Sequence, residues 1–264
     1  MIGTETSWIR VSLFWGGLLF FLILELFVPY RKSTVSKAKR WVHNVELTIF
    51  NTVFLQLLFA GAIVSTAAYV ANREVGVLNM VSLPAWANVL VTVVFMDFML
   101  YVWHLLNHEV PFLWRFHRVH HSDLNMDVST ATRFHIGELA ISTVIKISLV
   151  FFTGAPLLGV LVFECALVLC AQFHHSSLAV PGWFEKIFWV FFVPPSMHRI
   201  HHSVVIKERN TNYGTIFSTW DRAMGTLLMD VDQTRIRIGV GAYQKPGRLD
   251  FRRLLVMPFT RPIR

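Results

Sequence analysis

Histidine spacing is the feature of this sequence with the clearest chemical meaning. The chain has 12 histidines, and ten of them fall in four short groups: His104-x-x-x-His108, His117-x-x-His120-His121, His174-His175 and His198-x-x-His201-His202. A spacing of three or four residues places side chains on one face of a helix. Imidazole is also the commonest transition-metal ligand. The first, second and fourth groups supply eight nitrogens, which are too many for one ion and suit two, so we predict a dinuclear metal enzyme in a membrane.

The ligand type alone does not select the metal, because neutral imidazole binds iron, zinc, copper and nickel. The two cysteines, Cys165 and Cys170, lie in an apolar stretch and match neither a redox pair nor a zinc ribbon. The lack of a thiolate disfavours copper(I) and iron–sulfur clusters. Two iron ions could activate dioxygen and oxidise a C–H bond, so we predict an oxidase. Two alternatives stay open: a membrane metal-binding or transport protein without oxygenase activity, and a zinc hydrolase. Transport predicts ligands near the bilayer midplane, and hydrolysis predicts a carboxylate base, which the histidine groups do not contain.

Long apolar segments must position these histidines. Hydrophobic residues make up 54% of the chain, and the mean hydropathy is +0.51. Three segments have roughly the 20 apolar residues that cross a bilayer: Val11–Pro29, Leu47–Val70 and Pro84–Asn107. Two shorter segments, Leu139–Phe152 and Leu157–Phe173, flank a Thr-Gly-Ala-Pro break that no helix continues through. We therefore predict an all-α polytopic protein with about three full transmembrane helices, a re-entrant or short helical hairpin, and a histidine-rich helical cap.

Charge indicates the orientation of these helices. Residues 31–40 contain five basic residues and no acid: Arg31, Lys32, Lys37, Lys39 and Arg40. Under the positive-inside rule this loop is cytoplasmic. The N-terminus is then outside, and every histidine group lies at the cytoplasmic face. The net charge of +8 suits an anionic leaflet, and we expect no nucleic-acid partner because no nucleic-acid-binding motif is present.

Electrons for an oxidase must come from elsewhere. The sequence contains no Gly-rich dinucleotide fingerprint, no Cys-x-x-Cys-His haem site and no iron–sulfur spacing. We therefore expect a separate electron donor.

A series of ordered motifs resembles the fatty acid hydroxylase/sterol desaturase superfamily, and its bacterial integral-membrane members in particular. The motifs are Asp97-x-x-x-Tyr101-x-x-His104-x-x-x-His108, Trp114-x-x-His117-x-x-His120-His121-Ser122, Arg133-Phe-His135-x-x-Glu138, His175-Ser, Pro195-x-Met-His198-Arg-x-His201-His202-Ser, Asn212-Tyr-Gly and Trp220-Asp221-x-x-x-Gly225-Thr226. The resemblance extends from about Asp97 to Thr226, half of the chain.

The resemblance implies a non-haem centre of two iron ions, dioxygen as the oxidant and a lipid substrate in the bilayer. The reaction would be hydroxylation, desaturation or ether cleavage after hydroxylation. It also implies a bacterial inner-membrane location and a donor such as a ferredoxin or a b-type cytochrome. Neither the particular lipid nor the oligomeric state follows from it.

Nine histidines match the metal ligands of the family: His104, His108, His117, His120, His121, His175, His198, His201 and His202. His175 is preferred over its neighbour His174 because the family places its ligand before a small polar residue. His135 and His174 are expected to be extra ligands or to lie beside the ligands.

Several polar residues are expected to support the ligands. Asp97 lies two helical turns before His104, so its carboxylate is expected to accept a hydrogen bond from a ligand imidazole or from Tyr101. A plain contact between helices is the alternative for Asp97. Asp123, Glu138, Asn212 and Asp221 are further candidates for orienting ligands, unless they only cap helices. We expect one membrane domain over residues 1–264, with the catalytic region at 97–226 and a cytoplasmic tail at 227–264. The part of this tail after a turn at Gln244–Arg248 is expected to be loosely ordered and to lie along the membrane.

Overall fold

The fold is helical throughout the part of the chain that the computed structural model describes, residues 2–261, with side chains described from Trp8 onward. This part has three isolated β-bridges and no β-strand. Its α-helices are α1 (Ile2–Phe27), α2 (Lys37–Phe59), α3 (Ala62–Arg73), α4 (Ala85–Glu109), α5 (Pro111–His121), α6 (Ile136–Thr153), α7 (Leu157–His175), α8 (Gly182–Phe191), α9 (Pro195–His201), α10 (Ile206–Arg209), α11 (Thr219–Met224) and α12 (Phe251–Val256). Short 3-10 helices are η1 (Val77–Met80), η2 (Val128–Thr132), η3 (Gly241–Tyr243), η4 (Pro246–Arg248) and η5 (Met257–Phe259).

Five segments of the described chain are long and apolar enough to cross a bilayer: Trp8–Phe27, Lys37–Met80, Ala85–Glu109, Ile136–Thr153 and Leu157–His175. The prediction of an all-α polytopic protein is therefore confirmed. The predicted count of three full helices plus a hairpin is not confirmed, because α6 and α7 each reach spanning length. Many apolar side chains of these five segments face outward. Leu57 of α2, for example, has 77% of its surface exposed. Such an apolar surface suits contact with lipid.

Glycines decide where these helices break. The predicted span Leu47–Val70 is interrupted at Gly61, which has a φ of 70° and lies between the end of α2 and the start of α3. Gly154 ends α6 with a φ of 69°. A Cβ on Gly76 would lie 2.2 Å from the backbone nitrogen of Gly154, so only glycines allow the η1 loop to contact the α6–α7 turn. The predicted break before Leu157 is thus present, but it joins two long helices.

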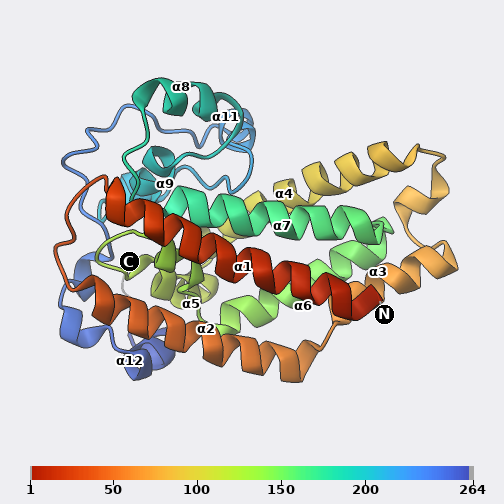
Figure 1. Cartoon of the computed structure of the whole chain (residues 1–264), viewed down its shortest axis with the longest axis horizontal. Helices are drawn as coiled ribbons and strands as arrows, with labels where there is room; N and C mark the ends of the chain where they lie inside the picture. The colour runs from red at the N-terminus through yellow and green to blue at the C-terminus, as the bar shows by residue number, and fades with distance from the viewer. Residues whose placement is uncertain (1, 262–264) are drawn as a thin grey trace.

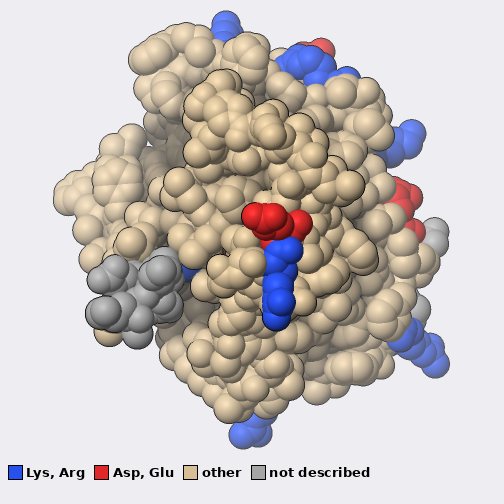
Figure 2. Space-filling view, turned by 90° about the vertical axis from the view of Figure 1, so that its right-hand side faces the viewer, with Lys and Arg blue, Asp and Glu red and all other residues tan. Residues whose placement is uncertain are grey.

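The long helices run side by side, and the short helices gather at one end of them (Figure 1). That end contains α5, α8, α9, α11 and α12, together with the last turns of α1 and α7 and the first turns of α2 and α6. The opposite end carries the α2–α3–η1 excursion. Figure 2 shows this opposite end as mostly uncharged, with few acidic or basic side chains. The two ends of the helices thus differ in structure, and the end at α3 presents few charges.

The C-terminal segment is packed against the helices, in contrast to the predicted loose tail. Ile238, Leu254 and Met257 are buried. The guanidinium of Arg118, on α5, donates hydrogen bonds to the main-chain carbonyls of Met257 and Thr260. Residues 262–264 lie outside the described part of the chain. Leu254 and Met257 pack with Val119 of α5, and Ile238 packs with Met197 and Ile200 of α9.

Candidate metal centre

Nine buried histidines form two compact groups at the end of the molecule where the short helices gather. In each group one ring nitrogen from every member lies within 4.8 Å of those of the others. The five-histidine group consists of His104, His108, His117, His121 and His201, and the four-histidine group consists of His120, His175, His198 and His202. These are the same nine residues that the sequence motifs single out as candidate ligands.

Each His-x-x-His-His motif contributes to both groups. Helix α5 directs His117 and His121 to the five-histidine group and His120 to the four-histidine group. The second motif shows the opposite distribution. His198 of α9 and His202, directly after α9, belong to the four-histidine group, and His201 belongs to the five-histidine group. The reason is helical geometry: residues four apart share a face, whereas adjacent residues point about 100° apart. The rings of His121 and His202 stack at 4.4 Å between centroids, so the two groups adjoin.

Backbone and side-chain oxygens orient five of the imidazoles. Nδ1 of His104 lies 2.8 Å from the carbonyl of Tyr213, and Nδ1 of His201 lies 2.8 Å from that of Thr211. Nδ1 of His175 lies 2.7 Å from the carbonyl of Ala171, and Nδ1 of His117 lies 2.8 Å from Oε1 of Glu138. Nδ1 of His108 lies 3.5 Å from Oδ1 of Asn210. A proton on Nδ1 leaves the Nε2 lone pair free for a metal ion.

The free nitrogens have the environment that a metal ion requires. Nε2 of His175 lies 3.0 Å from Nε2 of His120 and 2.9 Å from Nε2 of His198. Its own proton faces Ala171, so it cannot donate to either neighbour. Two nitrogens bound to one ion at about 2.1 Å lie roughly 3 Å apart, which matches these separations. In the five-histidine group, Nε2 of His108 and Nε2 of His201 are likewise buried without a hydrogen-bond partner in the described chain. The donor set therefore fits two metal ions.

Burial keeps these imidazoles neutral. It lowers the pKa of His120, His121, His198, His201 and His202 well below the usual value, and neighbouring histidines lower it further. Only the neutral imidazole offers a lone pair to a metal. At neutral pH these residues are thus in the form that binds metal.

The loop from Thr211 to Trp220 holds the two carbonyls that orient His201 and His104. Asp221 accepts hydrogen bonds from the backbone nitrogens of Tyr213 and Gly214, each at 2.7 Å. Asn212 has a positive φ of 57° and bonds to the carbonyls of Met197 and Leu228. Asn212 and Asp221 thus act through the backbone and do not touch the imidazoles.

Asp97 has a different role from the two that the sequence suggests. Its carboxylate accepts hydrogen bonds from the backbone nitrogens of Ile216 and Phe217 and from the indole of Trp220. It bonds to neither His104 nor Tyr101, and Tyr101 pairs instead with Thr226 at 2.9 Å. Asp97 therefore anchors the Thr211–Trp220 loop to α4, because its carboxylate is fully used by that loop.

The remaining candidates occupy separate positions. His135 caps α6, with Nδ1 accepting from Gly137 N and Nε2 donating to Leu255 O, so it lies in neither histidine group. His174 is buried, and its ring lies 4.0 Å from that of His198 between centroids, but it also belongs to neither group. Glu138 bonds to His117, so a carboxylate does lie beside the centre, although it is outside the histidine motifs.

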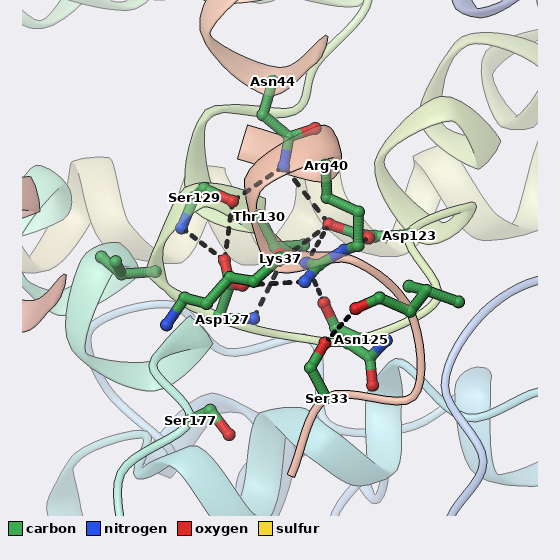
Figure 3. Close-up of polar contacts among 12 residues, drawn as sticks. Ser33, Lys37, Arg40, Asn44, Asp123, Asn125, Asp127, Ser129, Thr130 and Ser177 are labelled. Atoms are coloured by element: carbon green, nitrogen blue, oxygen red, sulfur yellow. Dashed lines mark hydrogen bonds and ion pairs between the residues drawn. The ribbon is translucent and has the colours of Figure 1, made fainter. Parts of the chain in front are cut away.

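A buried polar cluster, absent from the sequence-based expectations, fixes the loop after α5. Figure 3 shows Arg40 of α2 bonded to Asp123 and Asp127, with Asn44 bonded to Asp123 and Ser129. Burial by itself would raise the pKa of the Asp123 carboxyl, but Arg40 outweighs it and holds that pKa below its usual range. Arg133 extends the cluster to the carbonyl of Val119, one residue before His120. Two members of the cluster have a sequence signal: Arg133 belongs to the Arg-Phe-His motif, and Asp123 is among the residues expected to orient a ligand. In the structure Asp123 bonds to Arg40 and Asn44 and not to an imidazole.

A cavity of about 330 Å³ borders both histidine groups. His104, His117, His120, His174, His175 and His198 line one part of it. Apolar side chains from five helices line the rest, including Phe14, Leu55, Leu100, Leu139 and Leu167. Lys146 also lines it and lies 3.7 Å from Glu164. Cavities of this size with few polar groups hold small molecules or parts of lipids.

Helices, membrane-length segments and clustered histidines together define an integral membrane protein with a histidine-rich centre. The chain belongs to the fatty acid hydroxylase family, which it matches over residues 89–226. It is 30% identical to the ornithine lipid hydroxylase OlsE of Rhizobium tropici over 258 residues, 90% of this chain and 72% of that protein.

Other relatives match about half of this chain. Human cholesterol 25-hydroxylase is 27% identical over 53% of this chain and 51% of its own length. Human alkylglycerol monooxygenase is 30% identical over 49% of this chain and 28% of its own length. No solved structure matches the chain.

Proposed function

We propose that the chain is a di-iron, dioxygen-dependent enzyme that hydroxylates, or desaturates, a C–H bond of a membrane lipid. The observation that carries the proposal is the pair of buried all-histidine groups beside an apolar cavity. The relatives support it, because their names describe hydroxylases or a monooxygenase of ornithine lipid, cholesterol and alkylglycerol. These names differ in substrate but share oxidation of a lipid.

The chain's own residues would do three things in this reaction. The nine histidines would hold two iron ions, which when bound supply the oxidising chemistry that transfers oxygen from dioxygen to carbon. The carbonyls of Thr211 and Tyr213 would keep His201 and His104 aimed at the ions. The apolar walls of the cavity would exclude water and hold the lipid against the histidines.

We further propose that the histidine end faces the cytoplasm of a bacterial inner membrane, with the N-terminus outside. The basic loop supports this orientation, although two of its five cations have acidic partners: Lys37 pairs with Glu25, and Arg40 with Asp123 and Asp127. Arg31, Lys32 and Lys39 remain as the basis for the positive-inside rule. Electrons would then arrive from a cytoplasmic donor such as a ferredoxin or a b-type cytochrome.

The test combines metal analysis with isotope labelling. Chain produced in iron-replete cells should contain about two iron ions bound through nitrogen, measured by X-ray absorption. Membranes containing the chain, supplied with oxygen-18 dioxygen, should form lipids that carry the label if the reaction is hydroxylation, or unlabelled lipids with a new C=C bond if it is desaturation. Membranes with a His120→Ala, His201→Ala double variant should form neither product. The parallel experiment uses oxygen-18 water with unlabelled dioxygen. A product that takes its oxygen atom from water would instead support the zinc hydrolase, for which Glu138 beside His117 would be the candidate base.

A further inference from the structure

The cavity beside the histidines is lined by four residues of the described chain that have a buried oxygen without a hydrogen-bond donor. One of these oxygens, Oε1 of Gln172, adjoins Gly17 of α1, where a Cβ would lie 2.1 Å from it. The other three lie near the histidines. They are Oδ1 of Asn51, Oδ1 of Asn107 and Oε2 of Glu138, and each is buried and unpartnered in the described chain. All three residues line the cavity. A buried acceptor without a donor costs free energy, so a molecule that fills the cavity and brings donors would be favoured.

The two amides are held in one orientation. Nδ2 of Asn51 donates to the carbonyl of Phe134 at 2.8 Å, and Nδ2 of Asn107 donates to that of Trp103 at 2.9 Å. A flipped amide would place its oxygen against a carbonyl oxygen, so the nitrogen must take that side. Each amide therefore presents its acceptor, and not its donor, away from those carbonyls.

The three acceptors lie at the metal end of the cavity. Glu138 bonds through its other oxygen to His117. Asn107 lies between His104 and His108 on α4. Asn51 is bonded to Phe134, whose ring stacks on His120 at 4.4 Å between centroids. Glu138 thus contacts a histidine of the centre directly, Asn107 is next to His108 in the sequence, and Asn51 is bonded to a residue that contacts His120.

The walls contributed by Phe14, Leu55 and Leu167 are apolar. The cation among the cavity residues, Lys146, is on α6 eight residues after Glu138, a rise of about 12 Å. It already has Glu164 as a partner. Three of the four unpartnered oxygens are therefore at the histidines, and the side of the cavity at Phe14, Leu55 and Leu167 combines apolar walls with the single amide of Gln172.

We infer that the substrate is a lipid with hydrogen-bond donors, a hydroxyl or an amide N–H, and that these donors bind Asn51, Asn107 and Glu138 beside the metal centre. Its hydrocarbon part would then extend toward Phe14 and Leu55. The C–H bond that reacts would lie close to the donor-bearing group and not at the far end of the hydrocarbon. This inference rests on the proposed lipid oxidation, because it concerns the same cavity.

A binding comparison tests the inference without turnover. The full chain in phosphatidylcholine nanodiscs is titrated with four probes of equal chain length: dodecanol, dodecanamide, methyl dodecanoate and dodecane. Dodecanol and dodecanamide should each bind about tenfold more tightly than methyl dodecanoate, which only accepts hydrogen bonds. The two donor probes also separate a hydroxyl lipid from an amide lipid. Equal binding of donor and ester probes would overturn the inference, because water alone would then satisfy the three acceptors.

Variants assign the preference to the named side chains. Asn51→Leu and Asn107→Leu should each reduce the preference for donor probes, and the double variant should nearly abolish it while still binding methyl dodecanoate. Binding of the ester shows that the variant is folded. Asn107→Thr, which keeps an acceptor oxygen, should retain part of the preference. Thr52→Val is the matched control, because this cavity residue already donates its hydroxyl to Thr48 O, and it should keep the full preference.

The result separates this inference from the proposed function. Oxygen-18 incorporation into lipid together with equal probe binding would overturn the inference and leave the proposed function standing. Donor selectivity that depends on Asn51 and Asn107, without any lipid oxidation, would overturn the proposed function and support the binding site. Donor selectivity that persists in the double variant would overturn the assignment to these residues.

Discussion

The carboxylate of Asp97 accepts a hydrogen bond from the indole nitrogen of Trp220 at 2.8 Å, across 123 residues of sequence. The same carboxylate binds two backbone nitrogens of the loop that precedes Trp220. That loop supplies the carbonyl of Tyr213 to His104. Asp97 of α4 is therefore connected to His104, a candidate ligand on the same helix, through the Thr211–Trp220 loop.

Replacing Asp97 should impair the centre without emptying it. Asp97→Asn removes one acceptor oxygen and introduces an NH₂ group facing donors, so the loop should shift and misorient His104. We expect most of the iron to remain and turnover to fall roughly 10- to 100-fold, as for other residues that orient metal ligands. Iron content and lipid oxidation are measured together. The exposed Asp232→Asn is the control and should change neither, whereas full activity in Asp97→Asn would contradict the anchoring role.

Single histidine variants should empty one group at a time. His120→Ala removes a ligand from the four-histidine group, and His201→Ala removes one from the five-histidine group. Each variant should retain about one of two metals and lose turnover. His43, which pairs with Glu46 away from both groups, is the control, and His43→Ala should keep both metals. Loss of both ions from each single variant would show that the two groups bind metal as one unit.

The adjacent histidines of α7 should behave differently. His175 belongs to the four-histidine group, and His174 only borders the cavity. His175→Ala should therefore lose metal and activity, and His174→Ala should keep its metal and at least part of its activity. Metal content by mass spectrometry separates the two variants. If His174→Ala alone loses metal, the ligand assignment on α7 is wrong.

Acid should destabilise the Arg40 cluster. The pKa of Asp123 is lowered in the folded chain, so its contribution to the free energy of unfolding is present above about pH 4, its unfolded pKa, and is lost as pH falls toward the folded value. Asp123→Asn should lower stability at neutral pH by roughly 1.5–3 kcal/mol, because Arg40 loses its hydrogen bonds to one carboxylate but keeps Asp127. Thermal unfolding in detergent at several pH values measures both effects. The variant should show a smaller loss of stability on acidification than the wild type, and an equal loss would contradict this assignment.

Labelling in intact cells tests the proposed orientation. In a background with Cys165 and Cys170 replaced by alanine, Lys207→Cys at the histidine end should be protected from an impermeant maleimide. Arg73→Cys, at the end of α3 on the opposite side, should be labelled. Both side chains are exposed. External labelling at position 207 with protection at position 73 would reverse the topology.

The sequence by itself determined the helical membrane class, the break before Leu157 and the nine histidines that come together. These features depend on local periodicity: apolar runs of spanning length form helices, and spacings of three and four place imidazoles on one face. Spacing identifies eight of these histidines, and the ninth, His175 in place of His174, comes from the resemblance to the family. In the structure only His175 joins a histidine group.

Only the tertiary structure decided which histidine belongs to which group and what holds it there. His120 and His121 are adjacent in sequence, but they face different groups because a helix turns by about 100° per residue. The carbonyls that orient His104 and His201 come from a loop without helical periodicity. The partner of Asp97 is 123 residues away, and Arg40 counted as a free cation until the fold placed Asp123 and Asp127 beside it. Contacts between segments so far apart depend on how the helices pack together, and residue spacing carries no information about that packing.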